Sequence, residues 1–193
     1  MRTVRGSPGR REEKRRQTHQ RIFDEALRLF RERGFDSVSV GEIARAAQVS
    51  VPTFYAHYES KDHLILALPA PEVVEQAVLA VPGDLPPFER VQAALVAALV
   101  EGRIEPTEQI LERWRIIAAS PALRLRAAEF ERATAEMALQ ALPAGTAASP
   151  ATQVTVTALM AAYTQILLRW AESDGRRPVE EVVEEVLAAL RDL

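Results

Sequence analysis

The sequence predicts an all-α protein, with an N-terminal three-helix domain followed by a larger helical domain. From Thr18 onward, apolar residues recur at the three- and four-residue spacing of amphipathic helices. Capping residues, prolines and glycines mark the ends of these segments. No segment shows the apolar–polar alternation of a half-buried strand. These three observations favour helices throughout the chain.

The composition is that of an ordinary soluble globular protein. Of 193 residues, 48% are hydrophobic and 26% are charged, which is enough apolar material for a sizeable core. The absence of cysteine excludes disulfides, thiolate metal sites and cysteine nucleophiles, and it fits a reducing cytoplasm. No apolar run follows the basic residues up to Arg16, and the apolar stretch 158–168 is shorter than the ~18 residues of a membrane span. We therefore expect a cytoplasmic protein without a membrane segment.

Charge is distributed unevenly between the two parts of the chain. Residues 1–68 contain 13 Lys or Arg against 9 Asp or Glu, whereas residues 69–193 contain 11 against 18. Such asymmetry indicates that the first part meets a polyanion.

The first 16 residues predict a disordered basic arm. They include seven Lys or Arg together with Gly6, Pro8 and Gly9, and few apolar side chains are available for burial. Two interpretations stay open, a solvated tail and an arm that contacts phosphates.

A helix is expected from Thr18 to Arg33. Ile22, Ala26 and Leu29 belong to a wide apolar stripe, and Gly34 is a typical residue after a helix C-terminus.

Two short helices should follow, joined by a tight turn. Ser39 and Glu42 have the spacing of a capping box, which predicts a helix over residues 40–47. Ser50 is a second N-cap, and Pro52 suits the first turn of a helix over 51–57. Two such helices separated by residues 48–50 are typical of a helix-turn-helix, which places a DNA-binding domain over residues 17–68.

The second short helix is too polar for a core helix and suits a DNA major groove. Val51 and Thr53 are placed to contact base edges or thymine methyl groups. Tyr55 and His57 carry hydrogen-bonding groups suited to phosphate oxygens. Ser60 is a third N-cap, and Lys61 opens the next helix, where free amides favour a further phosphate.

The run from Phe35 to Lys61 resembles the DNA-binding signature of the TetR family of transcription regulators. The resemblance covers residues 15–68 and implies phosphate contacts and variable base contacts on the recognition helix. It also implies that Phe54 and Tyr58 anchor the small core. The DNA-contact set that we expect is Ser39, Arg45, Ser50, Val51, Pro52, Thr53, Tyr55, His57 and Lys61.

Two positions depart from the family pattern. Gln48 stands where glycine is frequent, so the turn is expected to need a left-handed non-glycine residue. Gly41 lacks a side chain that some members use for DNA contact, which shifts the expected specificity to the recognition helix and Arg45.

The second domain, residues 69–193, is predicted to be entirely helical. Pro69 and Pro71 interrupt or kink the fourth helix. The remaining helices are expected over residues 88–100, 107–119, 121–142, 151–172 and 179–190, with a loop of small residues over 143–150.

The last two helices are expected to form a homodimer interface. The last helix has valines and leucines from Val179 to Leu190 on one face and glutamates on the other. The preceding helix is too apolar to face water, its apolar positions being Ala158, Leu159, Ala162, Ile166, Leu167 and Trp170. A two-fold dimer would also match a palindromic operator. The alternative is that both helices pack only within one subunit.

The second domain is also expected to bind a small-molecule effector. The segment from Glu112 to Pro121 resembles the TetR-family regulators associated with mycofactocin gene clusters, which implies a response to long-chain acyl-CoA. The expected pocket residues are Arg113, Trp114, Met137, Met160 and Tyr163, with Arg115 and Arg124 as further partners for an anionic head group. The alternative for each position is an ordinary core or surface residue.

An enzyme is not expected, and neither a cofactor nor a metal is implied. The three histidines lack metal-ligand spacing, and no phosphate loop or nucleophile elbow occurs. The resemblance implies a ligand-responsive repressor of transcription. The alternative is a helical ligand-binding or interaction protein that no longer binds DNA.

Overall fold

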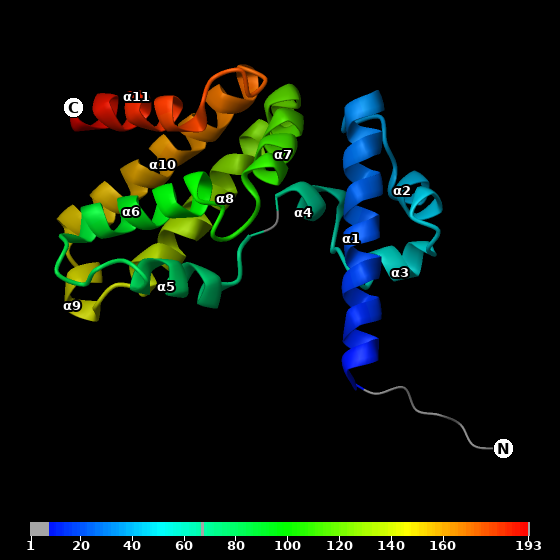
Figure 1. Ribbon diagram of the computed structural model, residues 1–193, viewed down its shortest axis with the longest axis horizontal. Coiled ribbons are helices and arrows are strands. Elements are labelled where there is room, and N and C mark those ends of the chain that lie inside the picture. The colour runs from blue at the N-terminus through cyan, green and yellow to red at the C-terminus, as the bar shows by residue number, and fades with distance from the viewer. Residues whose placement is uncertain (1–7, 67, 193) are drawn as a thin grey trace. The chain divides into compact units, whose positions relative to one another are not determined.

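The computed structural model describes residues 8–66 and 68–192, and within these ranges every regular element is a helix. The chain forms two compact units, with the boundary between Ile65 and Leu66. The first unit contains α1 (Pro8–Arg33), α2 (Val40–Ala46), α3 (Val51–Tyr55) and α4 (Lys61–Ile65) (Figure 1). The second contains α5 (Pro71–Leu79), α6 (Pro87–Val100), α7 (Thr107–Ala119), α8 (Pro121–Gln140), α9 (Ala144–Ala147), α10 (Pro150–Glu172) and α11 (Val179–Arg191). The predicted all-α fold is confirmed.

Serine caps begin the short helices of the first unit, as the sequence predicts. The Ser39 hydroxyl accepts from the amide of Glu42 while the Glu42 carboxylate accepts from the amide of Ser39, a complete capping box. The Ser50 hydroxyl accepts from the amide of Thr53, and the Ser60 hydroxyl accepts from the amide of His63 at 2.9 Å. These bonds satisfy amides that have no partner within their own helix.

The turn between α2 and α3 requires a left-handed residue, and Gln48 supplies it with φ of 54°. The expectation drawn from the missing glycine is therefore confirmed. The core below this turn consists of apolar side chains that are almost completely buried, among them Ile22, Ala26, Ile43, Ala44 and Phe54. Burial of Phe54 fixes α3 against α1 and α2, because a single aromatic side chain contributes a large apolar area.

The predicted disordered arm is wrong for residues 8–16, which belong to α1; residues 1–7 lie outside the described part of the chain. Gln17 and Arg16 both hydrogen-bond Glu13, and such contacts three and four residues apart stabilise a helix that the apolar stripe has already nucleated. The amino-acid composition of residues 8–16 did not predict this N-terminal extension of α1.

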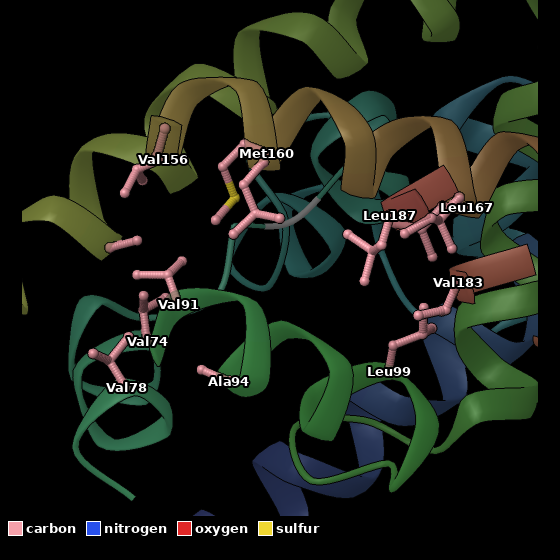
Figure 2. Packing of buried hydrophobic residues seen from close by; sticks show 14 of the residues in the cluster. Val74, Val78, Val91, Ala94, Leu99, Val156, Met160, Leu167, Val183 and Leu187 are labelled. Carbon is pink, nitrogen blue, oxygen red and sulfur yellow. The ribbon is translucent and has the colours of Figure 1, made fainter. Parts of the chain in front are cut away.

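The second unit is built around α10. This helix packs against α6, α7, α8 and α11, and its buried residues include Val156, Leu159, Met160, Leu167 and Trp170. Figure 2 shows valines and leucines from α5, α6, α10 and α11 converging on one cluster. By length and composition α10 is apolar enough to cross a membrane, but here its apolar side chains form the core.

Several helix boundaries differ from the sequence expectation, and α3 in particular ends at Tyr55 rather than residue 57, whereas the predicted interruption at Pro69 and Pro71 is confirmed. The fourth helix ends at Ile65, and α5 begins separately at Pro71, because proline at both 69 and 71 excludes a continuous helix. Helix α8 ends at Gln140 rather than residue 142, and the loop after it contains the single-turn helix α9.

The apolar faces predicted for a dimer interface are turned into the subunit. On α11, Val179, Val182, Val183 and Leu187 are buried against the rest of the second unit. On α10, the same holds for Leu159, Ala162, Ile166, Leu167 and Trp170. These buried positions of α10 and α11 therefore pack within one subunit, and the homodimer through the last two helices stays a prediction.

Candidate nucleic-acid interface

Helix α3 presents one face to its own domain and one face to solvent. Phe54 is fully buried, whereas Val51 is 40% and Tyr55 54% exposed. Pro52 is also exposed. The anchoring by Phe54 and the Ser50 cap hold this five-residue helix in place, since a helix of this length has no independent stability. The predicted base-contacting residues Val51 and Pro52 thus lie on an accessible surface.

Ser50 and Thr53 are joined to each other. Their hydroxyl oxygens are 2.7 Å apart, and the Thr53 amide donates to the Ser50 oxygen at 3.2 Å. Thr53 is partly buried. A base contact through either hydroxyl would therefore compete with the cap, which leaves the Thr53 methyl group as the simpler contact with thymine.

Ser39 is committed to the cap of α2. Its hydroxyl donates to the Glu42 carboxylate at 2.7 Å, and Arg33 forms an ion pair with the same carboxylate at 2.7 Å. The hydrogen bonds from Ser39 and Arg33 lower the pKa of Glu42 to about 2. Arg45, in the last turn of α2, is exposed and accessible to a ligand.

Lys61 also has partners within the domain. Its ammonium donates to the carbonyl oxygens of Phe35 at 2.8 Å and Val38 at 3.0 Å, and it lies 4.1 Å from the centroid of the Phe35 ring. These contacts fasten the start of α4 to the loop before α2. Any phosphate contact by Lys61 would have to use its third N–H or break one of these bonds.

His57 lies in a cluster that the sequence analysis missed. Its ring centroid is 5.8 Å from that of His19 on α1, and the His19 ring stacks on Tyr58 at 4.3 Å. The Tyr58 hydroxyl donates to the His19 carbonyl oxygen at 3.2 Å. His19 precedes Ile22 by about one helical turn. The helical spacing could therefore have predicted that His19 lies on the same face of α1 as the buried Ile22.

The second unit contains a shallow apolar hollow that is partly open to solvent and encloses only about 10 Å³, room for about one water molecule. Its walls come from α6, α10 and α11, and the lining residues are Gln92, Leu95, Val96, Leu99, Leu159, Tyr163, Ile166, Val183 and Leu187. Of the five predicted pocket residues, only Tyr163 is among them. Met160 is a core residue, and Trp114 and Met137 pack at the edge of the same core.

Arg113 pairs with a carboxylate of its own chain. It forms an ion pair and a hydrogen bond with Glu105, and both side chains are mostly buried. Burial raises the pKa of Glu105, although Arg113 acts in the opposite direction. Burial also raises the pKa of Tyr163 to about 12, with Arg113 and Glu105 acting on it as nearby charges. Tyr163 thus connects the apolar hollow with a polar corner.

The other two arginines proposed for a head group are paired as well. Arg115 forms an ion pair with the Asp174 carboxylate at 2.8 Å, and Arg124 forms an ion pair with Glu172 at 2.8 Å. Both pairs join α7 or α8 to the end of α10, and this position indicates a structural role.

The first domain matches a known family. The profile described as "Bacterial regulatory proteins, tetR family" matches residues 22–68. The HTH-type transcriptional regulator TcmR of Streptomyces glaucescens is 30% identical over 145 residues, 70% of this chain and 62% of that protein. The HTH-type transcriptional regulator AcrR of Shigella flexneri is 48% identical over 48 residues, 25% of this chain and 22% of that protein. The chain therefore spans less than two thirds of these relatives.

Solved structures share the fold over most of the chain. NalD, the secondary repressor of the MexAB-OprM multidrug efflux pump in Pseudomonas aeruginosa, has a TM-score of 0.61 and 19% identity, covering 93% of this chain and 96% of its own. FadR of Thermus thermophilus, a repressor solved in complex with lauroyl-CoA, has a TM-score of 0.52 and 25% identity, covering 89% and 92%. The matched profile, the exposed face of α3 and the capped turn before it all agree: the chain belongs to the TetR family of bacterial regulatory proteins.

Proposed function

We propose that the protein is a sequence-specific DNA-binding transcription regulator of the cytoplasm, and that it is a repressor released from its operator by a small apolar or amphipathic effector. The observation that carries this proposal is the accessible face of α3, where Tyr55 is 54% exposed beside Val51 and Pro52. A capped helix held by one buried aromatic residue has the form of a recognition helix that enters the major groove. The relatives named above are regulators rather than enzymes, which supports the same conclusion.

A homodimer is part of this proposal, formed by the outward face of α10. Val154, Ala158, Ala161, Gln165 and Leu168 follow one another at alternating four- and three-residue steps, opposite the buried side of the helix. Val154 is 68% exposed. The spacing is that of a seam between packed helices, and small alanines allow two such helices to approach closely. A two-fold dimer would present two copies of α3 to the half-sites of a palindromic operator.

The effector site that we propose is the hollow between α6, α10 and α11, which encloses about 10 Å³ and therefore has to widen by movement of these helices to admit a ligand. Its lining is almost wholly apolar, with Gln92 and the Tyr163 hydroxyl as polar groups, which favours an acyl chain or another apolar group. Long-chain acyl-CoA is the first effector to test, because the similar FadR structure contains lauroyl-CoA. Helix α10 has the hollow on one face and the proposed seam on the other, so it is placed to couple effector binding to dimer geometry. The effector acts only through its difference in affinity between the two states.

The DNA proposal is tested by fluorescence anisotropy with duplexes from the neighbouring intergenic region. We expect salt-dependent binding with a preferred site, because phosphate contacts release counterions and α3 reads bases. Tyr55→Ala should weaken binding to all duplexes alike with little change in the salt slope, because a neutral hydroxyl releases no counterion, whereas Thr53→Ala should change the preferred sequence. Leu125→Ala is the control, since Leu125 is an exposed residue of α8 in the second unit.

The alternative is a helical ligand-binding or interaction protein that no longer binds DNA. It would be supported if the wild-type protein bound none of the duplexes at any salt concentration.

The effector is tested by adding lauroyl-CoA to a preformed complex of the protein with its duplex. Release of the duplex supports the proposal, and unchanged anisotropy at saturating lauroyl-CoA rejects this ligand.

A further inference from the structure

Three side chains that carry or acquire positive charge meet on one side of the first unit. His19 and His57 are neighbours, with ring centroids 5.8 Å apart, although 38 positions separate them in the sequence. Arg15 lies one helical turn before His19 on α1 and acts electrostatically on both histidines. Stacking on Tyr58 and the bond from its hydroxyl hold His19 in position.

Among the residues that the structure describes, no carboxylate acts electrostatically on His19 or His57. The charged groups that act on His19 are His57 and Arg15, and the one that acts on His57 is Arg15. Asp24 of α1 acts electrostatically on the neighbouring Tyr58. Within residues 8–66, Arg15 has no ion pair, in contrast to Arg16, Arg28 and Arg33. Once protonated, His19 and His57 would repel each other and Arg15, so their charged forms need an added anion for stabilisation.

Burial and the neighbouring positive charges lower the pKa of both histidines, burial being the larger cause for each. In the free protein near neutral pH the two rings are therefore mostly uncharged. An anion placed between them would reverse the electrostatic part of this effect, because an opposite charge within ~4–6 Å favours the charged form. Binding of an anion and uptake of protons are then linked.

The geometry suits a phosphate group of DNA. His19 and His57 each carry ring nitrogens that can donate a charge-assisted hydrogen bond, and with their ring centroids 5.8 Å apart both rings are close enough to donate to oxygens of one phosphate group. His57 follows directly after the exposed helix α3, so its cluster borders the surface proposed to meet the duplex. Arg15 lies within α1, which begins at Pro8, so the helix fixes its backbone one turn before His19.

We propose that Arg15, His19 and His57 form one binding site for a phosphate of the DNA backbone, and that its occupation takes up protons on the two histidines. The proposal rests on the proposed DNA-binding function and adds two residues, Arg15 and His19, together with a dependence on pH. Affinity for any duplex should therefore rise as the pH falls from 8 to 6.

The experiment uses the full chain and a fluorescein-labelled 30-bp duplex of mixed sequence at constant ionic strength. Between pH 7.5 and 6.0 the wild-type affinity should increase about 3- to 10-fold, up to a factor of 10 per pH unit for each proton taken up. His19→Gln and His57→Gln should each reduce this increase, and the double variant should abolish it. His63→Gln is the matched control and should behave as the wild type. Arg15→Gln should weaken binding about equally across the pH range.

A second readout is independent of the variants' folding. In wild-type protein, the ring protons of His19 and His57 should report by NMR a pKa that rises when the duplex is added. Millimolar inorganic phosphate should produce a smaller rise. A rise of equal size would identify the site as one for free phosphate and overturn its assignment to DNA.

The outcomes separate the two proposals. Duplex binding that is independent of pH, or a pH dependence that the His63 variant removes, overturns the phosphate site and leaves the DNA-binding function intact. No duplex binding at any pH overturns the DNA-binding function itself.

Discussion

Single residues of this protein are held by contacts that are local in sequence and easy to isolate by substitution. Glu42 is the most connected example, since it accepts from the Ser39 amide and hydroxyl and pairs with Arg33. All these partners favour the carboxylate over the acid, which is why the pKa of Glu42 falls to about 2.

We expect the contribution of Glu42 to stability to depend on pH in acid solution. A lowered pKa means that the stabilisation is fully present above the unfolded value of 4.5 and is lost as the pH falls toward 2. Thermal unfolding should therefore show Glu42→Ala less stable than wild type at pH 6, with the difference in Tm shrinking below pH 4.5. Glu12→Ala, an exposed glutamate of α1, is the control, and a Tm difference that stays constant down to pH 2 contradicts the assignment.

Gly175 is a residue for which a side chain has no room. Its φ is +67°, and a Cβ built on it would lie 2.6 Å from Cδ2 of Leu111. The preceding Asp174 is also left-handed, and its carbonyl oxygen accepts from Arg115 at 2.7 Å, so the turn after α10 is tied to α7.

Gly175→Ala should accordingly destabilise the protein by about 1–2 kcal/mol from the left-handed conformation alone, and by more if Leu111 cannot move. Urea unfolding followed by circular dichroism measures the change. The matched control is Gly145→Ala in α9, where no atom lies within 4 Å of the added Cβ and alanine is the better helix former. Equal stability of the two variants would rule out this description of the turn.

Among the elements, the turn between α2 and α3 decides how the recognition helix is presented. Gln48 takes the left-handed conformation that glycine adopts without strain, and the amide of Val49 donates to the Ala44 carbonyl oxygen at 2.9 Å to close the turn. Strain at this position is offset by the packing of Phe54 and the two caps.

Gln48→Gly should stabilise the first unit by about 0.5–1 kcal/mol, the left-handed strain removed less the added freedom of the unfolded chain. Gln48→Ala retains the strain and should show no gain. Chemical denaturation of both variants provides the measurement, and a Gly variant less stable than the Ala variant would show that the Gln48 side chain itself contributes to the turn.

At the scale of the whole molecule, most large apolar side chains of the described residues are buried within the chain, and the outward face of α10 is the surface that we propose for a second subunit. Ala161 lies in the middle of that face and is not part of the core cluster.

Ala161→Arg should therefore convert the proposed dimer into a monomer, because an unpaired guanidinium at the centre of a seam cannot be desolvated without loss. Light scattering after size exclusion measures the mass, and affinity for a palindromic duplex should fall with it. Leu125→Arg, on the exposed surface of α8, should keep the wild-type mass. A wild-type protein that is monomeric at micromolar concentration would reject the seam.

Local rules were sufficient for much of this fold. Serine caps at residues 39, 50 and 60, the strained Gln48 turn, and the existence of every long helix follow from interactions within a few residues, and the structure agrees with them. The extension of α1 to Pro8 was not predicted. The composition of a basic segment fits a disordered tail as well as it fits a helix that continues from the apolar part of α1.

The sequence by itself determined which segments are helical, where they are capped and which family signature they carry, because these properties depend on neighbours along the chain. Only the tertiary structure decided which apolar faces are buried within the subunit. It also decided that Arg113 forms an ion pair with Glu105, that Lys61 donates to the Phe35 and Val38 carbonyl oxygens, and that His19 lies beside His57. Those outcomes join residues far apart in the chain, and a pattern shows that a side chain needs a partner without showing which partner packing brings to it.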